Sequence, residues 1–248
     1  MSSYLITGCS RGLGLELVKQ LLSAPASSVR TVIATSRDLS PSAALDEQIQ
    51  SSQGRASYVQ LNVLDEETIR SACQHASQIL KDQGLDVLIN NAGIRVIENN
   101  GPCDMHALQS TLETNVLAVH KISSTFLPLL QQGMQKKIVN ITSTLGSIGL
   151  NHYTKMMPLS SYKISKTALN MLTVQYANDL DSKGFTVFCI SPGWLRTDLG
   201  GANADLAPDV GAKATMDVIY NSTKNDNGAF RNIFIAGEQV YNGGNPPW

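Results

Sequence analysis

The chain has 248 residues, of which 42% are apolar, and a formal net charge of −1. This length suits one α/β domain with a sizeable core. The balanced charge, with no run of lysines and arginines, argues against a nucleic-acid partner. The chain opens on a strand-like stretch, so we expect no signal peptide or membrane span, and hence a soluble protein. Four cysteines lie far apart without ligand-like spacing, which predicts reduced thiols, no metal and a cytoplasmic location.

Seven short apolar runs alternate with helical patterns along the chain. The predicted strands are Tyr4–Thr7, Thr31–Thr35, Tyr58–Leu61, Val87–Asn90, Ile138–Ile141, Thr186–Ser191 and Asn232–Ile235. Leu13, Leu17 and Leu21 mark the apolar face of the first helix between them. Strands alternating with helices predict a Rossmann-type, doubly wound parallel sheet of about seven strands with helices on both faces. No linker or repeat interrupts this order, so we expect residues 1–248 to form a single domain.

A glycine-rich stretch, TGCSRGLG, follows the first predicted strand directly and opens the first helix. Glycines let the backbone turn tightly and approach a pyrophosphate, while free amides and the helix dipole favour its negative charge. Three residues rather than one separate the first two glycines, which departs from the usual dinucleotide fingerprint. A structural turn uses glycine too. We expect a phosphate site formed by Gly8, Ser10, Arg11, Gly12, Leu13 and Gly14.

The stretch NNAG follows the fourth predicted strand, at the edge of the sheet where such folds bind ligands. Two asparagines and a glycine also make ordinary turns. Together with the glycine turn, Asn91, Ala92 and Gly93 predict a nucleotide lying across the point where the strand order reverses.

The sequence SSYKISK carries a tyrosine and a lysine four residues apart, Tyr162 and Lys166, on one face of a helix. A phenol is a poor proton donor or acceptor near neutral pH, and a nearby cation lowers its pKa by stabilising the phenolate. The rival Tyr153 has Met157 four residues beyond it. Lys163 lies about 100° round the helix from Tyr162 and is predicted to face solvent. We therefore assign the chemistry to Tyr162 and Lys166.

Two further polar residues support a reaction site. Ser143 ends the stretch that leads out of the fifth predicted strand, at the carboxyl edge of the sheet. Asn115 stands inside a helical pattern, where asparagine is otherwise a poor choice. Each residue alone has an ordinary structural explanation, but their combination with Tyr162 and Lys166 favours a catalytic set.

In this order, TGCSRGLG, NNAG, Asn115, Ser143, YKISK and SPGWLRT resemble the motifs of the short-chain dehydrogenase/reductase family over essentially the whole chain. Within the family, the chain looks most like carbonyl reductases related to the insect sniffer protein and the bacterial C-factor, and like fungal ketoreductases of polyketide pathways. The resemblance implies reduction of a ketone or aldehyde to an alcohol by hydride transfer.

The resemblance also implies a role for each matching residue. Tyr162 would protonate the carbonyl oxygen as general acid, and Lys166 would lower its pKa and hold the nicotinamide ribose. Ser143 would hydrogen-bond the developing oxyanion, and Asn115 would hold a water that relays protons to Lys166. The resemblance places four residues along the nicotinamide: Pro192, Gly193, Leu195 and Thr197. Of these, Thr197 would hold the carboxamide.

The end of the second predicted strand favours NADPH over NADH. A carboxylate there would bond a free ribose 2′-hydroxyl and repel a 2′-phosphate, and the chain has the uncharged Ser36 instead. Arg37 follows and Arg11 precedes Gly12, so two guanidinium groups can approach the same phosphate. Asp38 is a rival, because a shift of two residues in the end of the strand would reverse the preference.

Two features depart from the family pattern. Ser143 and Tyr162 are 19 positions apart, so an insertion around Leu150–Leu159 should loop out before the catalytic helix. Asn62, followed by Val63, stands where the family usually has an aspartate near the adenine. Its amide can still bond an amino group, so we expect both residues to contact the cofactor.

The insertion and the segment after Trp194 predict the substrate pocket. We expect it to be lined by Leu145, Tyr153, Met156, Met157 and Trp194, although such side chains are also common core filler. Gly200 and Gly201 would permit a mobile cover over the site.

Two other functions stay open from the sequence. A non-catalytic NADP(H)-binding sensor or scaffold would share the fold, and alcohol oxidation would use the same residues in reverse. The resemblance also implies a homodimer or homotetramer through the helices that carry Asn115 and Tyr162.

Overall fold

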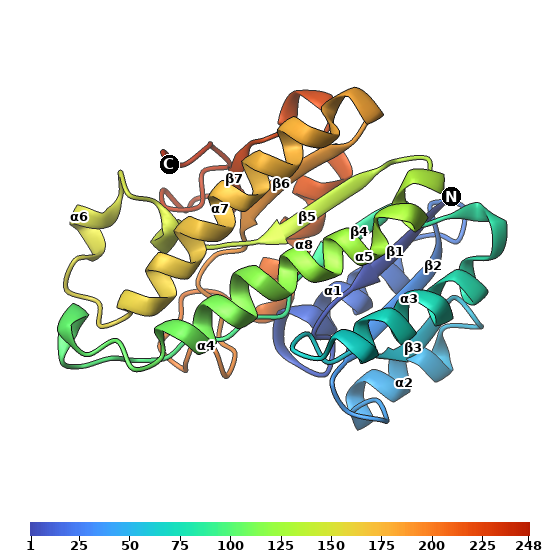
Figure 1. The fold of residues 1–248 in the computed structure, drawn as a ribbon, viewed down its shortest axis with the longest axis horizontal. Coiled ribbons are helices and arrows are strands. Elements are labelled where there is room, and N and C mark those ends of the chain that lie inside the picture. The colour runs from blue at the N-terminus through green and yellow to red at the C-terminus, as the bar shows by residue number, and fades with distance from the viewer.

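In the computed structural model, which describes residues 1–248, seven parallel strands form one sheet (Figure 1). The strand order is β3-β2-β1-β4-β5-β6-β7. The strands are β1 (Ser2–Ile6), β2 (Val29–Ser36), β3 (Ala56–Gln60), β4 (Val87–Asn90), β5 (Lys137–Ile141), β6 (Thr186–Ser191) and β7 (Phe230–Asn232). The predicted doubly wound parallel sheet is confirmed.

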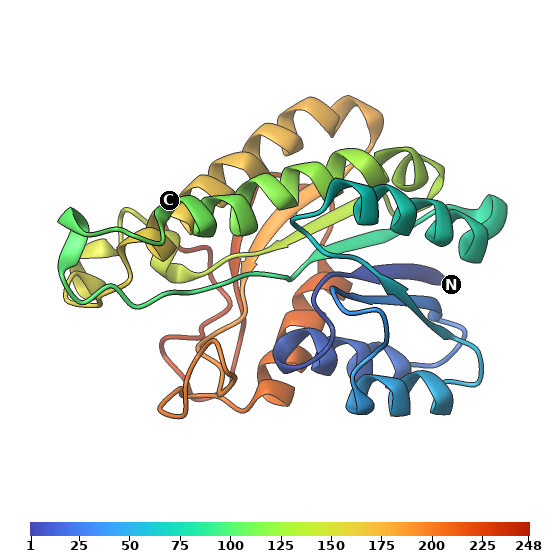
Figure 2. The ribbon, with the colours of Figure 1, turned by 60° about the horizontal axis from the view of Figure 1, so that its bottom comes forward.

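Helices cover both faces of the sheet. They are α1 (Gly12–Ser23), α2 (Ala43–Ser51), α3 (Glu66–Leu80), α4 (Leu108–Leu112), α5 (Ala118–Gln132), α6 (Asn151–Thr154), α7 (Ser160–Leu180) and α8 (Pro208–Asn221). Figure 2 shows α3, α5 and α7 on one face and α1, α2 and α8 on the other. None of these helices combines the length and the apolar character that crossing a membrane requires.

The alternation of side chains along each strand divides the core into two. In β1, Tyr4 and Ile6 belong to the core beneath α1 and α8, whereas Leu5 between them belongs to the core beneath α3 and α5. All three side chains are at most 2% exposed. Burying a large apolar side chain contributes about 1.5–3 kcal/mol, and a strand buried on both faces needs such a continuous apolar run.

The strand order reverses between β1 and β4. Ile6 of β1 is level with Ala34 of β2 on one side and with Ile89 of β4 on the other. The loops that follow β1 and β4 therefore leave the sheet in opposite directions and open a crevice at its carboxyl edge.

The seventh strand begins earlier than its predicted range of Asn232–Ile235. β7 pairs with β6 from Phe230 to Asn232. It ends there because the Asn232 side chain accepts from the Ile233 amide at 3.1 Å and donates to the Val240 carbonyl at 2.7 Å, so the chain turns away.

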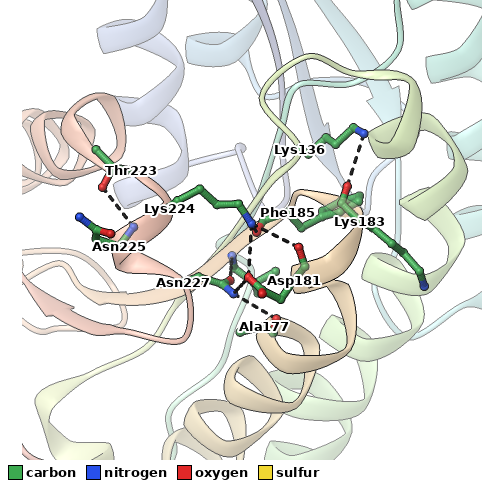
Figure 3. A network of polar contacts seen from close by, with 10 residues as sticks. Lys136, Ala177, Asp181, Lys183, Phe185, Thr223, Lys224, Asn225 and Asn227 are labelled. Carbon is green, nitrogen blue, oxygen red and sulfur yellow. Dashed lines mark hydrogen bonds and ion pairs between the residues drawn. The ribbon is translucent and has the colours of Figure 1, made fainter.

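The end of α7 distant from the crevice is fixed by a polar network (Figure 3). Lys224 Nζ donates to the Phe185 carbonyl at 2.9 Å and lies 3.3 Å from Asp181 Oδ1. Asn227 Nδ2 donates to the Ala177 carbonyl at 3.1 Å and to Asp181 Oδ1 at 3.0 Å. Exposed ion pairs contribute little energy, but these bonds set the position of the helix that carries Tyr162.

Candidate active site

The glycine turn between β1 and α1 forms a cradle suited to a phosphate. Gly8 and Gly12 have φ angles of 74° and 57°, in the left-handed region that favours glycine. A Cβ atom on Gly14 would lie 2.2 Å from the Gly8 carbonyl oxygen, so only glycine lets α1 pack this closely against the turn. No side chain caps the start of α1, and its first amides remain available to an anion.

The other predicted residues of the turn surround this cradle. The Ser10 carbonyl accepts from Ser42 Oγ at 2.7 Å, and Leu13 packs against the core. The exposed Arg11 side chain lies 3.0 Å from the Asp198 carboxylate. A Cβ on Gly12 would be 3.4 Å from Thr197 Cγ2, so the structure brings Thr197 against the glycine turn.

The NNAG segment ties the end of β4 to the end of β1. The amides of Asn91 and Ala92 both donate to Thr7 Oγ1 at 3.0 Å. Asn91 Nδ2 donates to the Thr7 carbonyl at 2.8 Å. A Cβ on Gly93 would lie 3.1 Å from Asn115 Oδ1 and 3.7 Å from Lys166 Nζ. The segment thus connects the glycine turn with the residues assigned to the chemistry.

β2 ends at Ser36, as the sequence argument for the 2′-phosphate requires, and not at Asp38. Ser36 is buried, and its hydroxyl shares a 2.9 Å hydrogen bond with the Tyr58 hydroxyl, a partner that sequence patterns did not indicate. Arg37 is exposed, with Nε 3.8 Å from Asp38 Oδ1. Arg37 and Arg11 therefore each face an acidic neighbour and are accessible from solvent.

After β3, Asn62 and Val63 lead toward α3. Asn62 is half-buried, and its Oδ1 accepts from the Leu64 amide at 3.2 Å. An amide oxygen has two lone pairs, so one remains for an amino group. Val63 packs against the core beneath α3 and α5.

Asn115 lies in a π-helical turn, Glu113–Leu117, between α4 and α5. Its Nδ2 donates to the Ile94 carbonyl at 2.9 Å and to Ser165 Oγ at 3.0 Å, and its Oδ1 accepts from the Ile94 amide at 2.9 Å. Such turns are rare and often occur at functional sites. The buried amide thereby joins the segment after NNAG to α7.

Ser143, Tyr162 and Lys166 meet at the carboxyl edge of β5. Tyr162 and Lys166 are 6% and 5% exposed. Lys166 Nζ donates to the Ile141 carbonyl at 2.8 Å and lies 5.6 Å from the centre of the Tyr162 ring. Ser143 Oγ accepts from the Leu145 amide at 3.2 Å.

Burial dominates the titration of this pair. It raises the pKa of Tyr162 to about 12, against smaller lowering effects of a hydrogen bond with Ser143 and the positive charge of Arg95. Burial also lowers the pKa of Lys166 to about 8. The expected lowering of the phenol pKa by Lys166 does not occur in this arrangement, because the ammonium faces the Ile141 carbonyl instead.

Two residues of the segment after NNAG escaped the sequence analysis. Arg95 is half-buried, with Nη2 4.0 Å from the position of a Cβ on Gly201. Glu98 is 1% exposed and accepts from the Ser161 amide at 2.9 Å, from Ser161 Oγ at 2.7 Å and from the Ala107 amide at 3.2 Å. Neither residue belongs to a periodic pattern, so only their three-dimensional surroundings single them out.

The insertion forms the short helix α6, which projects from the sheet beside the start of α7 (Figure 1). Lys163, predicted to face solvent, is half-buried and donates to the Thr154 carbonyl at 2.5 Å, so that prediction is wrong. Tyr153, Met156 and Met157 are 76%, 86% and 43% exposed. The structure does not bury these three side chains in a pocket with the half-buried Leu145, because Tyr153 on α6 and both methionines in the turn after it lie at the surface.

The segment after β6 is held by close backbone contacts. Gly193 has a φ of 85°, and Pro192 before it and Leu195 after it are buried. Trp194 Nε1 donates to the Gly200 carbonyl at 2.8 Å. A Cβ on Gly200 would lie 1.8 Å from the Leu195 carbonyl oxygen, so this glycine serves close packing.

The C-terminal residues reach back to the loop after Ser143. The Gly149 amide donates to the Trp248 carbonyl at 2.9 Å, and Ser147 Oγ donates to the Pro247 carbonyl at 2.5 Å. The Trp248 ring lies 5.5 Å from that of Phe230 in β7. The tail thus links the edge strand to the loop that carries Ser143.

Comparison with known proteins agrees with this arrangement. The family profile described as short chain dehydrogenase matches residues 3–206. The chain is 31% identical to the short-chain dehydrogenase anuI of Penicillium roqueforti, over 84% of each chain.

Solved structures extend the similarity to the whole chain. An NADPH-bound carbonyl reductase from chicken fatty liver superposes with a TM-score of 0.86 and 31% identity, covering 100% of this chain and 99% of that one. The carbonyl reductase Sniffer of D. melanogaster superposes with a TM-score of 0.87 and 30% identity over all of both chains. The chain belongs to the short-chain dehydrogenase family.

Proposed function

We propose that the protein is an NADP(H)-dependent reductase that converts a ketone or aldehyde into an alcohol, with residues 1–248 acting as one domain. The observation that carries the proposal is the convergence of Ser143, Tyr162 and Lys166 with the Asn115 amide beside the glycine turn and NNAG. Resemblance to the NADPH-bound reductase supports the choice of cofactor.

The residues around the glycine turn fit a dinucleotide. The left-handed glycines shape a tight turn, Gly14 lets α1 pack against it, and the uncapped first amides of α1 remain available to a phosphate. Arg11 and Arg37 are exposed, and each faces only one acidic side chain. Both can therefore turn toward a 2′-phosphate. Bound there, NADPH would supply the hydride. Asn62, Val63, Pro192, Gly193, Leu195 and Thr197 would complete the contacts.

Tyr162 would supply the proton of the reaction. As the carbonyl carbon accepts the hydride, the carbonyl oxygen takes the proton from the Tyr162 hydroxyl, and Ser143 Oγ donates to the same oxygen. Burial keeps the phenol protonated, since its pKa is about 12. The residue is therefore in the acid form that reduction needs.

Lys166 and Asn115 would restore the proton. Lys166 Nζ, with a pKa of about 8, is a stronger acid than the phenol and can return a proton to it once the two groups are bridged. The Asn115 amide is already committed to Ile94 and Ser165. Its role would be to fix the backbone at Ile94 in a position that leaves room for a water. This water would connect Lys166 to solvent.

Three further properties belong to the proposal. The four cysteines are all free thiols, which supports a cytoplasmic location. Leu117, Ile164 and Met171 leave apolar surface exposed near and along α7, which supports self-association as a homodimer or homotetramer. The substrate would be a small carbonyl compound.

One experiment tests the function and separates its alternatives. The purified protein is mixed with NADPH and a panel of aliphatic, aromatic and polyketide-like carbonyls, and loss of NADPH absorbance is followed. Reduction of at least one carbonyl supports the proposal. NADPH binding without turnover of any compound would favour the sensor or scaffold. Faster oxidation of the matching alcohols with NADP⁺ at neutral pH would favour the reverse reaction.

A further inference from the structure

We propose that Arg95 is a specificity-determining residue that binds a carboxylate on the substrate, so that the substrate is an oxo acid. The inference rests on the proposed carbonyl reduction and names a substrate class for it. It comes from the half-buried residue Arg95, whose guanidinium has no partner in the protein and which directly follows Ile94, the residue bonded to Asn115.

The Arg95 guanidinium takes part in no hydrogen bond or salt bridge within the chain. Most other arginines have a partner: a carboxylate faces Arg11, Arg37, Arg70 and Arg231, and backbone carbonyls accept from Arg55 and Arg196. The donors of Arg95 therefore remain free for an acceptor that the protein does not supply.

Arg95 lies close to the reaction site, because it directly follows Ile94, whose backbone is bonded to the Asn115 amide. Its positive charge acts on the Tyr162 phenol, and its Nη2 borders Gly201 in the segment after Trp194. The acidic residues of these same segments are engaged elsewhere. Glu98 is bonded to Ser161 and Asp104 accepts from Asn100. Asp198 pairs with Arg11, and Asp205 accepts from the Tyr241 hydroxyl. No internal counter-ion competes for the guanidinium.

A carboxylate on the substrate fits this donor. The planar guanidinium offers two parallel donors to the two oxygens of a carboxylate. The phosphates of the cofactor have their own site at the glycine turn, with Arg11 and Arg37. An anion at Arg95 would thus belong to the substrate.

Matched substrates test the assignment. The probes are 3- and 4-carboxybenzaldehyde, their methyl esters, and 4-formylphenyl phosphate, all with NADPH. We expect the native protein to reduce at least one acid with a kcat/KM about tenfold or more above that of its ester. In Arg95→Met this preference should fall by about 10–100-fold, the range for a hydrogen bond to a charged group. Arg95→Lys should retain part of it.

Control measurements distinguish a wrong assignment of Arg95 from a misfolded variant and from a wrong proposed function. Arg70→Met, which removes an exposed arginine of α3, should keep the acid preference, and NADPH binding checks that each variant is folded. Reduction of esters as fast as acids by the native protein would overturn the assignment and leave carbonyl reduction intact. An unchanged preference in Arg95→Met, or a tenfold preference for the phosphate over both acids, would also overturn it. No turnover of any probe or panel carbonyl would overturn the proposed function as well.

Discussion

Tyr162 and Tyr153 lie nine positions apart in the sequence and differ strongly in solvent exposure. Tyr162 is 6% exposed beside Ser143 and Lys166, whereas Tyr153 is 76% exposed on α6. We expect Tyr162→Phe to reduce kcat by about a hundredfold to ten-thousandfold, the usual range for loss of a general acid, with little change in NADPH affinity. Steady-state kinetics and NADPH titration check both. Tyr153→Phe is the matched control, and a dead Tyr153 variant beside an active Tyr162 variant would reverse the assignment.

Lys166 offers a test by pH because its folded pKa, about 8, lies below that of an unfolded lysine. Below pH 8 the lysine is protonated in both states, and its buried charge opposes folding. Between pH 8 and about 10 the unfolded chain binds the extra proton, so stability should rise with pH by about 1.4 kcal/mol per unit.

Comparison with the variant Lys166→Met isolates this effect. The variant lacks the lysine ammonium but keeps the buried tyrosines and cysteines, whose titration also affects stability at alkaline pH. Denaturant unfolding of both proteins at pH 7, 8, 9 and 10 gives the difference. The native protein should gain stability relative to the variant above pH 8. A difference that stays constant with pH would show that Lys166 keeps its proton when folded.

We expect the choice between NADPH and NADH to depend on the end of β2. Ser36→Asp places a carboxylate there, and Arg37→Ala removes a guanidinium, so each should lower kcat/KM with NADPH relative to NADH. Loss of one charged hydrogen bond corresponds to about 10–100-fold. The efficiency ratio for the two cofactors is measured before and after each change. A native preference for NADH would contradict the phosphate site.

At the scale of elements, a buried glutamate fixes the start of α7, the helix that carries Tyr162. α7 has no side-chain cap of its own, and the Glu98 carboxylate takes that place by accepting from the Ser161 amide. Burial alone would raise the pKa of Glu98, but hydrogen bonds from Ser161 and Ala107 outweigh it and hold this pKa below its ordinary range. A charge at this end also suits the helix dipole.

Glu98→Gln should lower the free energy of unfolding by about 2 kcal/mol at pH 7, because a charged acceptor of several buried hydrogen bonds is lost. Since the folded pKa is lowered, the contribution of Glu98 is fully present above the unfolded value near 4.3 and disappears as pH falls through the folded value. Thermal unfolding at pH 7 and at pH 3 measures this. Glu47→Gln, at an exposed position of α2, should change little at either pH.

The sequence predicted elements better than it predicted their connections. Glycines, NNAG and the Tyr162–Lys166 spacing are local patterns, and the structure places them together as expected. The caps and tethers were missed because they join segments far apart in the sequence: Glu98 to Ser161, and Ser36 to Tyr58. The π-helical turn at Asn115 was also missed, since its apolar spacing resembles that of an α-helix.

At the scale of the whole molecule, the C-terminal tail connects the edge of the sheet to the loop that carries Ser143. Pro247 and Trp248 accept hydrogen bonds from Ser147 and Gly149. Removing residues 246–248 should therefore loosen the loop that carries Ser143. We expect kcat/KM to fall about tenfold, within the range for a small displacement of a positioning group, while the NADPH dissociation constant changes little.

Kinetics of the shortened protein and of Trp248→Ala check this expectation. Trp248→Ala keeps the backbone carbonyl that Gly149 contacts, so it should cost less activity than the deletion. Equal activity of the shortened and native proteins would show that the loop holds its shape without the tail.

The strand order has a consequence for how the chain is made. β1, β2 and β3 extend the sheet in one direction, and β4 to β7 then extend it in the other. Each strand leaving the ribosome finds a free edge already formed, and none has to be inserted between two paired strands. Translation that stalls after α5 would leave the first four strands assembled with the edge of β4 unpaired, a template for aggregation until β5 is made.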